Sequence, residues 1–193
     1  LQKIYKKGEA RMSLAPADYD FGNASNYSFA TTITCGNDDA RKMFAEAFGH
    51  MLNFNHEQAI ACYMKTTELD SNCAMAWWGI AYCVSSNYNW TPGLGSGFDP
   101  IQQAISLKAG CTELEQDLID ALSERHSQEA RDAADPSVLN MGNTPELNAA
   151  FAAAMAPLYE KYKGNLDVAA IYVEALMNLK AWQLWDKNTE TGE

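Results

Sequence analysis

Apolar side chains recur at intervals of three and four residues through much of the chain, which is the spacing that one face of an α-helix produces. The first such stretch follows Asn37, Asp38 and Asp39, residue types that favour a helix start. Its apolar positions are Met43, Phe44, Ala47, Phe48, Met51 and Leu52. The pattern predicts a helix that has these polar residues at its cap and first turn and carries one buried stripe as far as Leu52.

Two more helices are predicted immediately afterwards, joined by very short links. Asn55 with Gln58 three residues later resembles the capping box that starts a helix, and a polar turn at residues 70–72 separates that helix from the next. The apolar positions are Ala59, Ile60, Tyr63 and Leu69, then Ala74, Trp77, Trp78, Ala81, Tyr82 and Val84. Links this short make consecutive helices antiparallel neighbours.

The middle of the chain predicts a loop and two shorter helices. Residues 85–97 are rich in glycine and asparagine, which disfavour a helix. Asp99 as the cap and Pro100 as the first helical residue predict a helix that ends at Gly110. A Thr-x-x-Glu capping box then opens another helix over residues 112–126.

The last third predicts a polar linker and two further helices. Residues 127–143 are polar and contain helix breakers, so we expect a linker there. Thr144 and Pro145 supply the cap and first position of a helix in which Pro157 is expected to cause a kink or a division. After a Gly-Asn turn, the final helix is predicted to carry apolar residues from Val168 to Leu179 and to end near Trp182 and Trp185.

Together these elements predict an all-α fold of antiparallel helix pairs, in one array over residues 37–186. Residues 1–36 lack sustained periodicity and are expected to form an irregular lead-in. Residues 187–193 are expected to be a polar tail or a point of truncation.

Two stretches follow the register of the tetratricopeptide repeat (TPR), a helix-pair unit of about 34 residues. Residues 40–73 carry Ala59 and Tyr63 where the second helix of such a unit has a small residue and an aromatic, and residues 74–109 carry Trp77 at the tryptophan position. The chain therefore resembles the TPR class, which implies a right-handed α-solenoid. Degenerate units are expected at residues 112–126 and 144–180.

More narrowly, the chain is similar to a group of large TPR proteins without an assigned reaction. The motifs that carry this similarity lie at residues 54–56, 73–81, 87–89 and 174–179. The similarity covers residues 40–186 and implies that the chain is the N-terminal part of a longer protein. Lys180, Ala181 and Trp182 depart from the group, which more often has a proline before the tryptophan.

In TPR proteins ligands usually lie on the concave surface formed by the first helices. The resemblance therefore implies a non-catalytic scaffold that binds a protein or peptide partner on that surface. Carried over, the contact positions are Arg41, Phe44, Phe48, Met51, Met75, Trp78 and Tyr82. Trp78 and Tyr82 are one helical turn apart and would offer a wide, stiff contact surface. The alternative is that the lead-in or the loop after residue 85 covers them.

Charge narrows the class of partner. Twenty-five acidic residues against fourteen basic ones give a formal charge of −11 and a pI near 4.6, which opposes contact with a phosphate backbone. Because of this charge, a nucleic-acid partner is not expected. No run of about 18 apolar residues exists, so a membrane span is not expected either. A surface that is apolar and partly acidic suits a basic or amphipathic segment of a partner protein.

Candidate chemistry is sparse. His50, His56 and His126 lack the i, i+4 spacing of a ligand pair on one helix face. No Cys-x-x-Cys pair, phosphate-binding glycine loop or nucleophile elbow occurs, so we predict no catalytic residue, metal or cofactor. The five cysteines are odd in number and irregularly spaced, which favours the cytoplasm or another reducing compartment over a disulfide framework.

Two alternatives to the scaffold hypothesis remain open. One is a metal-binding or enzymatic domain with a pocket of Asn55, His56, Asn87 and Asn89, beside the loop of residues 85–98. The other is a structural subunit of a larger assembly, since helix-pair units cannot bury their apolar faces alone.

Overall fold

The computed structural model describes residues 32–85, 87–89, 97–133 and 145–183. Within these ranges the chain forms eight α-helices and contains no strand, so the predicted all-α class is confirmed. The helices are α3 (Asp38–Leu52), α4 (His56–Leu69), α5 (Ala74–Val84), α6 (Phe98–Leu107), α7 (Glu113–Ser123), α8 (Gln128–Ala133), α9 (Pro145–Lys161) and α10 (Leu166–Met177), with 3₁₀ turns η2 (Lys108–Gly110) and η3 (Asn178–Lys180). The predicted tail, residues 187–193, and residues 1–31 of the predicted lead-in lie outside the described part.

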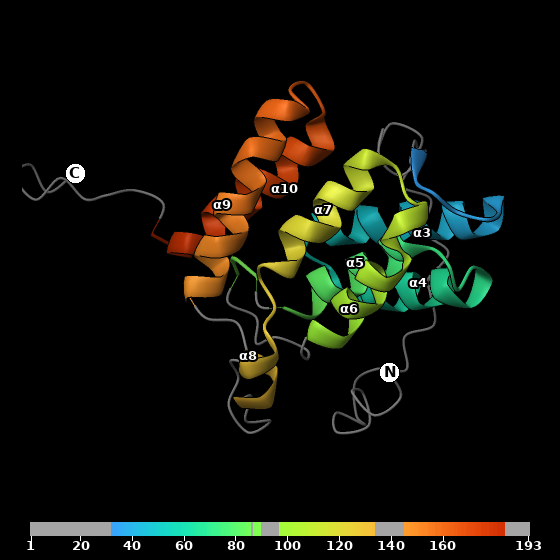
Figure 1. Cartoon of the computed structure of the whole chain (residues 1–193), viewed down its shortest axis with the longest axis horizontal. Coiled ribbons are helices and arrows are strands. Elements are labelled where there is room, and N and C mark those ends of the chain that lie inside the picture. The colour runs from blue at the N-terminus through green and yellow to red at the C-terminus, as the bar shows by residue number, and fades with distance from the viewer. Residues whose placement is uncertain (1–31, 86, 90–96, 134–144, 184–193) are drawn as a thin grey trace, which may run out of the picture.

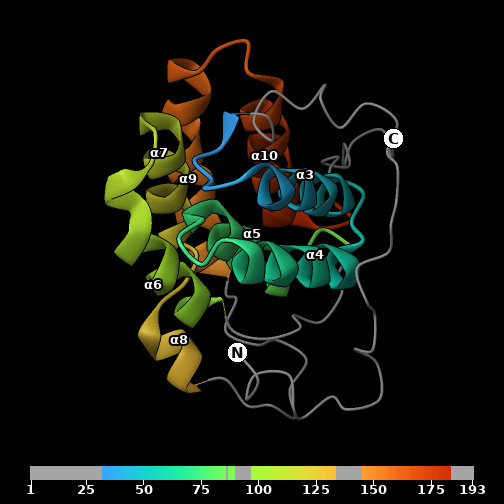
Figure 2. The same cartoon turned by 90° about the vertical axis from the view of Figure 1, so that its right-hand side faces the viewer.

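Each helix from α3 to α6 packs against the next one along the chain, after which α9 contacts α7 and α10 contacts α9. Figure 1 shows α3 and α4 at one end of this arrangement and α9 and α10 at the other. In the view of Figure 2, α6, α7 and α8 lie along one side, and α3 and α4 lie towards the other. One apolar core runs through the molecule and includes Phe44 of α3 and Ala175 of α10.

Polar caps start three helices where the sequence predicts helix starts. Asn37 Oδ1 accepts a hydrogen bond of 2.9 Å from the Ala40 N–H, and Asn165 caps α10 in the same way. The predicted capping box of Thr112 and Glu115 is present at the start of α7. These side chains satisfy N–H groups that a helix start leaves without an intrahelical partner.

Two predicted helix starts differ from the structure. Asn55 precedes α4, but its side chain makes no cap hydrogen bond and instead lies 3.3 Å from His50 Nδ1, so the predicted capping box with Gln58 is wrong. Helix α6 begins at Phe98 rather than at Pro100. Pro100 fits inside the first turn because the first N–H groups of a helix have no intrahelical acceptor.

The predicted linker at residues 127–143 contains the short helix α8 within its described part. Ser127 Oγ accepts a hydrogen bond of 3.0 Å from the backbone of the first turn. Arg131 of α8 forms an ion pair of 2.7 Å with Asp99 of α6, a tertiary contact that a local sequence pattern does not reveal. The predicted cap of the following helix, Thr144, lies outside the described residues.

Helix α9 is continuous from Pro145 to Lys161 with Pro157 inside it, so of the two predicted effects, a kink or a division, the division does not occur. A proline removes one N–H, which would otherwise bond to the carbonyl group four residues earlier. Residues 153 and 157 are both exposed, so water can satisfy that carbonyl group.

Helices α4 and α5 approach each other closely at Gly79. A Cβ atom at this position would lie 2.3 Å from Cζ of Tyr63, so the tyrosine ring occupies the space of a side chain. Ala59 and Ala81, the small residues expected to allow close approach, are both fully buried. The absence of bulk on α5 is therefore what lets the Tyr63 ring pack between the helices.

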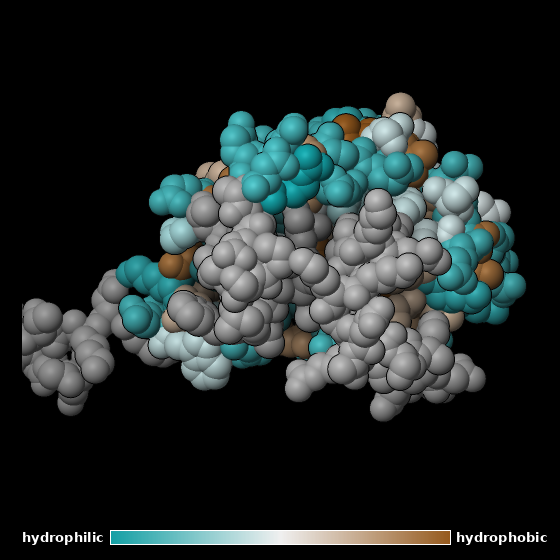
Figure 3. Space-filling model, turned by 90° about the horizontal axis from the view of Figure 1, so that it is seen from below, coloured by the Kyte–Doolittle hydropathy of each residue, from teal (hydrophilic) through white to brown (hydrophobic). Residues whose placement is uncertain are grey.

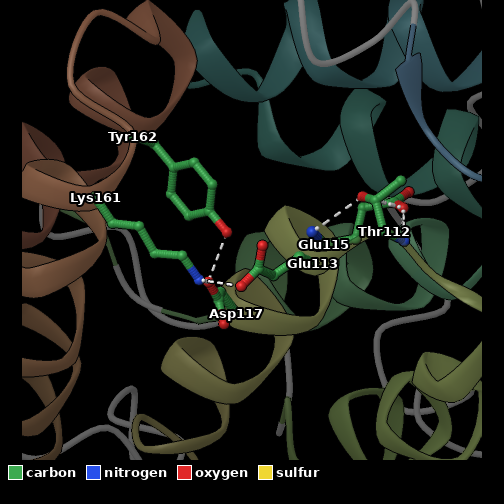
Figure 4. Close-up of polar contacts among 6 residues, drawn as sticks. All are labelled: Thr112, Glu113, Glu115, Asp117, Lys161 and Tyr162. Carbon is green, nitrogen blue, oxygen red and sulfur yellow. Dashed lines mark hydrogen bonds and ion pairs between the residues drawn. The ribbon is translucent and has the colours of Figure 1, made fainter.

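Helix α7 is tied to the end of α9 by a surface polar cluster (Figure 4). Lys161 Nζ lies 2.8 Å from Glu113 Oε1 and 2.6 Å from Asp117 Oδ2. The Tyr162 hydroxyl donates a hydrogen bond of 2.6 Å to the same Asp117 oxygen. These contacts orient α9 on α7, although exposed ion pairs contribute little to stability.

Glu115 has a second role besides capping α7. Its carboxylate accepts hydrogen bonds of 2.6 Å from the Thr34 N–H and 2.7 Å from the Thr34 hydroxyl. Glu115 is buried, and Figure 4 shows its side chain directed at Thr112. One carboxylate therefore holds both the first turn of α7 and the segment before α3.

Among the described residues, no helix combines the length and apolar character required to cross a membrane. Seen from below, the described residues are mostly hydrophilic, and apolar residues form small separate patches (Figure 3). The described residues on this face therefore form no large apolar surface.

Candidate functional site

The residues that the TPR resemblance assigns to a partner-binding concave face lie mostly in the core. Six of the seven are buried: Phe44, Phe48, Met51, Met75, Trp78 and Tyr82. The Trp78 indole donates a hydrogen bond of 3.0 Å to the Leu118 carbonyl group of α7, and the Tyr82 hydroxyl bonds to α10. Arg41 is half-buried and pairs with Asp38 at 2.5 Å. Helices α7 and α10 therefore cover Trp78 and Tyr82, and the six buried side chains present no surface to a partner in this structure.

Of the four residues predicted to form a pocket, two meet through their side chains. His56 Nδ1 lies 3.3 Å from Asn87 Nδ2, and both side chains are buried. Asn87 Oδ1 accepts a hydrogen bond of 2.9 Å from the Asn89 N–H, which fixes the turn after α5. The Asn55 side chain does not join them, because it lies beside His50.

His56 and Asn87 belong to a larger set of buried polar side chains, the polar centre, which also contains Tyr82, Arg125 and Glu174. The Tyr82 hydroxyl donates a hydrogen bond of 2.7 Å to Glu174 Oε2. The charge of Arg125 acts on both Glu174 and His56, which places these groups within electrostatic range. The polar centre is thus assembled from α4, α5, α10 and the segments that follow α5 and α7.

Arg125 is the permanent cation of the polar centre and is 1% exposed. Its Nε donates a hydrogen bond of 3.0 Å to Asn148 Oδ1 of α9. Its Cζ lies 6.0 Å from the centroid of the Tyr82 ring and 5.6 Å from that of Phe151. Aromatic faces and the amide oxygen offset part of the cost of removing a guanidinium from water.

Burial sets the protonation states around Arg125. It lowers the pKa of His56 to about 4, and the Arg125 charge acts in the same direction, so the imidazole is neutral at pH 7. Burial raises the pKa of Glu174, while the Tyr82 hydroxyl and Arg125 oppose that rise. Burial also raises the pKa of Tyr82 well above its ordinary value, so the phenol stays protonated and donates to the carboxyl group.

Two atoms of the polar centre have unused hydrogen-bonding capacity within the described part of the chain. Glu174 Oε1 is buried and makes no hydrogen bond of ordinary geometry there, although the Asn178 side chain lies near enough to lower the pKa of this carboxyl group. His56 Nε2 lies near the Cys83 carbonyl group but makes no hydrogen bond of ordinary geometry. Buried polar atoms are normally satisfied, so such atoms indicate a site for water or another small molecule.

Two aromatic residues beside the polar centre have left-handed backbone conformations. Phe54 has a φ of 57° and stacks on the His56 ring at a centroid distance of 6.2 Å. Trp182 has a φ of 62° and stacks on Tyr88, next to Asn87, at 5.5 Å. Bulky side chains rarely adopt this region, and such strain concentrates at functional sites.

A different feature lies on the outside of α10. Large apolar side chains are exposed along it and the turn that follows, and we call this surface the α10 face: Leu166 (80%), Val173 (53%), Leu176 (43%), Leu179 (44%) and Trp182 (67%). Elsewhere in the described residues only Phe54 and Leu69 are large, apolar and exposed. The two charged residues of α10, Asp167 and Glu174, are buried, so no charge interrupts the face along the helix.

Sequence reasoning missed Arg125 and Glu174. Glu174 lies three residues after Ile171 and directly before Ala175, within the apolar stripe of its helix. A charged residue at such a position is the signal of a buried charge. Arg125 gave no such signal because its contacts lie on other helices.

Within the described part of the chain, no three His, Cys, Asp or Glu side chains are arranged to hold a metal ion.

Comparisons of the chain with protein-family profiles, curated proteins and solved structures gave no match. Function is therefore inferred from the polar centre and the α10 face themselves.

Proposed function

We propose that the chain is a non-catalytic interaction scaffold whose α10 face binds an amphipathic helix of a partner protein. The observation that carries this proposal is the row of exposed apolar side chains on α10 and the turn after it. Leu166, Val173 and Leu176 are seven and three residues apart, so they share one side of the helix. Covering apolar surface is favourable by about 25 cal/mol per Å², which gives such a row affinity for another apolar face.

The scaffold is proposed to be a TPR-like right-handed solenoid of antiparallel helix pairs. Contacts between alternate helices support this arrangement, since α3 contacts α5 and α5 contacts α7 in addition to their chain neighbours. In a stack of helix pairs each unit buries its apolar face against the next unit. We infer that in such a stack a further helix would pack on the α10 face.

Charge defines the chemistry of the partner helix. The outer surface of α10 is uncharged, so the part of the partner that touches it should be apolar. The chain as a whole carries a formal charge of −11, which attracts basic residues flanking that apolar stripe and repels acidic ones. A helix with leucines on one side and lysines on the other meets both conditions.

The proposal is tested with two synthetic peptides that share a leucine face and differ in carrying lysine or glutamate on the other side. Fluorescence anisotropy with the labelled peptides measures the dissociation constants. We expect the lysine peptide to bind and the glutamate peptide to bind at least about tenfold more weakly. The double substitution Val173→Gln and Leu176→Gln should abolish binding of the lysine peptide.

Leu69→Gln is the matched control, because Leu69 is an exposed leucine outside the α10 face. Equal binding by the α10 variant and the Leu69 variant would place the contact elsewhere and reject the proposal. A concentration-dependent dimer that disappears in the α10 variant would instead identify a second copy of this chain as the occupant. Light scattering coupled to gel filtration distinguishes that outcome.

A second candidate function is binding of a small molecule at the polar centre. The specific observation is that Glu174 Oε1 and His56 Nε2 are buried without ordinary hydrogen bonds in the described part of the chain. A ligand with both a donor and an acceptor would satisfy them beside the Arg125 charge. The pocket predicted from His56 and Asn87 would then extend to these two residues.

Native mass spectrometry of the chain purified from its source tests this second function. A stoichiometric bound mass or metal ion that is lost in His56→Ala but kept in His50→Ala would support it. His50 is the matched control, because it is also buried and lies outside the polar centre. Unliganded protein in every preparation would leave the α10 face as the functional surface.

A further inference from the structure

Cys35 and Cys73 come from separate segments that Asp70 holds together. The Gly36 N–H donates a hydrogen bond of 2.6 Å to Asp70 Oδ2, and the Cys73 N–H donates one of 3.2 Å to the Asp70 carbonyl group. Gly36, which follows Cys35, and Cys73 itself are thus both hydrogen-bonded to Asp70. This arrangement brings the segment before α3 against the turn between α4 and α5.

The two thiols lie near each other in this arrangement. Each of the Cys35 and Cys73 thiols influences the pKa of the other, and Asp70 acts on both. Both cysteines are reduced; Cys35 is half-buried, and Cys73 is fully buried.

The other cysteines interact with other kinds of group. The Cys62 sulfur accepts from the Gln58 amide at 3.8 Å, and the Cys111 thiol contacts the Leu107 carbonyl group at 4.0 Å. The charge of Glu174 acts on the buried Cys83. The thiol pair is therefore a distinct feature of Cys35 and Cys73.

We propose that Cys35 and Cys73 form a reversible disulfide by exchange with a small-molecule disulfide such as oxidised glutathione. The half-exposed Cys35 thiolate attacks one glutathione sulfur, and a glutathione thiolate leaves. The Cys73 sulfur then attacks the Cys35 sulfur of this mixed disulfide and displaces the second glutathione. Two protein thiols are oxidised, one glutathione disulfide is reduced, and the two protons end on the two released thiols.

The disulfide would link the segment before α3 covalently to the turn between α4 and α5. It would reinforce the hydrogen bonds that Asp70 already makes there and restrict the unfolded chain. Burial raises the pKa of both thiols, so both are protonated at neutral pH and the exchange is slow. The pair therefore acts as a structural link that follows the redox state of its surroundings, independently of the α10 face.

The test treats the reduced, folded chain with oxidised glutathione, blocks the remaining thiols under denaturing conditions, and maps the peptides by mass spectrometry. We expect a peptide pair joined through Cys35 and Cys73. The unfolding midpoint of this form should be higher than that of the reduced chain, and dithiothreitol should reverse the rise. The variant Cys35→Ser should give no internal disulfide, whereas Cys111→Ser should still give the Cys35 to Cys73 link.

Cys111 is the matched control because it is also a half-buried thiol. A stable glutathione adduct on Cys35, without the link to Cys73, would overturn the proposal. A link that forms only when urea is present would also overturn it, because the folded geometry would then not position the two sulfurs.

Discussion

The Tyr82 hydroxyl and the Glu174 carboxylate form a hydrogen bond of 2.7 Å that connects α5 to α10 across 92 residues of sequence. Removing the hydroxyl in Tyr82→Phe leaves a buried carboxyl group without this donor. We expect the free energy of unfolding to fall by about 1–3 kcal/mol. Urea denaturation followed by circular dichroism measures the change.

Tyr172→Phe is the control for this experiment. Tyr172 lies on α10 and is half-buried, and it contacts Tyr159 through its ring. Its loss of a hydroxyl should change the unfolding free energy by less than about 0.5 kcal/mol. Equal losses of unfolding free energy in both tyrosine variants would show that the hydrogen bond between Tyr82 and Glu174 makes no specific contribution to stability.

Acid stability should depend on His56. The unfolded chain protonates this imidazole below its ordinary pKa of 6.5, whereas burial lowers the pKa in the folded chain to about 4. Stability is therefore lost as the pH falls from 6.5 towards 4, by about 2 kcal/mol between pH 7 and pH 4.5 for this one group. In His56→Gln that part of the acid loss should disappear, as measured by urea denaturation at pH 7 and pH 4.5.

The comparison between wild type and variant isolates His56 from other groups. Burial lowers the pKa of His126 to about 3, so this residue destabilises the folded chain at acid pH in the wild type and in the variant alike. Parallel stability curves for wild type and His56→Gln between pH 7 and pH 4.5 would mean that His56 is not held neutral in the folded chain.

Gly79→Ala should be destabilising although alanine is the better helix former. Its Cβ would meet the Tyr63 ring at 2.3 Å, and forcing bulk into a packed interface costs about 1–3 kcal/mol. Gly110→Ala is the matched control, because a Cβ there meets nothing within 4 Å. It should leave the melting temperature unchanged or raise it, so a similar drop in both variants would refute the steric explanation.

Glu115→Ala should cost more than the loss of an ordinary helix cap. It removes the capping box of α7 and both hydrogen bonds to Thr34, for an expected loss of about 2–4 kcal/mol. Thr34→Val removes only the hydroxyl bond and should cost about 1 kcal/mol. Chemical denaturation measures both, and a Glu115→Ala loss no larger than that of Thr34→Val would contradict the dual role of this carboxylate.

Local signals in the sequence predicted the helices well. The caps at Asn37 and Thr112 depend on interactions within four residues, so their residue types are readable directly. Helix α8 was not predicted, because it is short and polar and its contact between Arg131 and Asp99 joins it to another helix, which no local pattern shows. Asn55 has the right type for a capping residue, but its side chain lies beside His50 and makes no cap hydrogen bond.

The site was harder to predict than the fold because exposure is a tertiary property. Trp78 and Tyr82 have the same pattern whether they face a partner or lie under α7 and α10, and in the structure they lie under those helices. The meeting of His56 and Asn87 was anticipated from their places beside one turn and one loop. The charged residues of the polar centre, Arg125 and Glu174, lie far apart in the sequence, and no local pattern indicates that they meet.

The contact of Thr34 with Glu115 has a consequence for the order in which the chain folds. It joins residues 81 positions apart, so the segment before α3 acquires its acceptor only after the first turn of α7 has formed and docked. This early part of the sequence is thus fixed late in folding. Hydrogen exchange at the Thr34 amide would report on the integrity of the first turn of α7, 81 residues further along the chain.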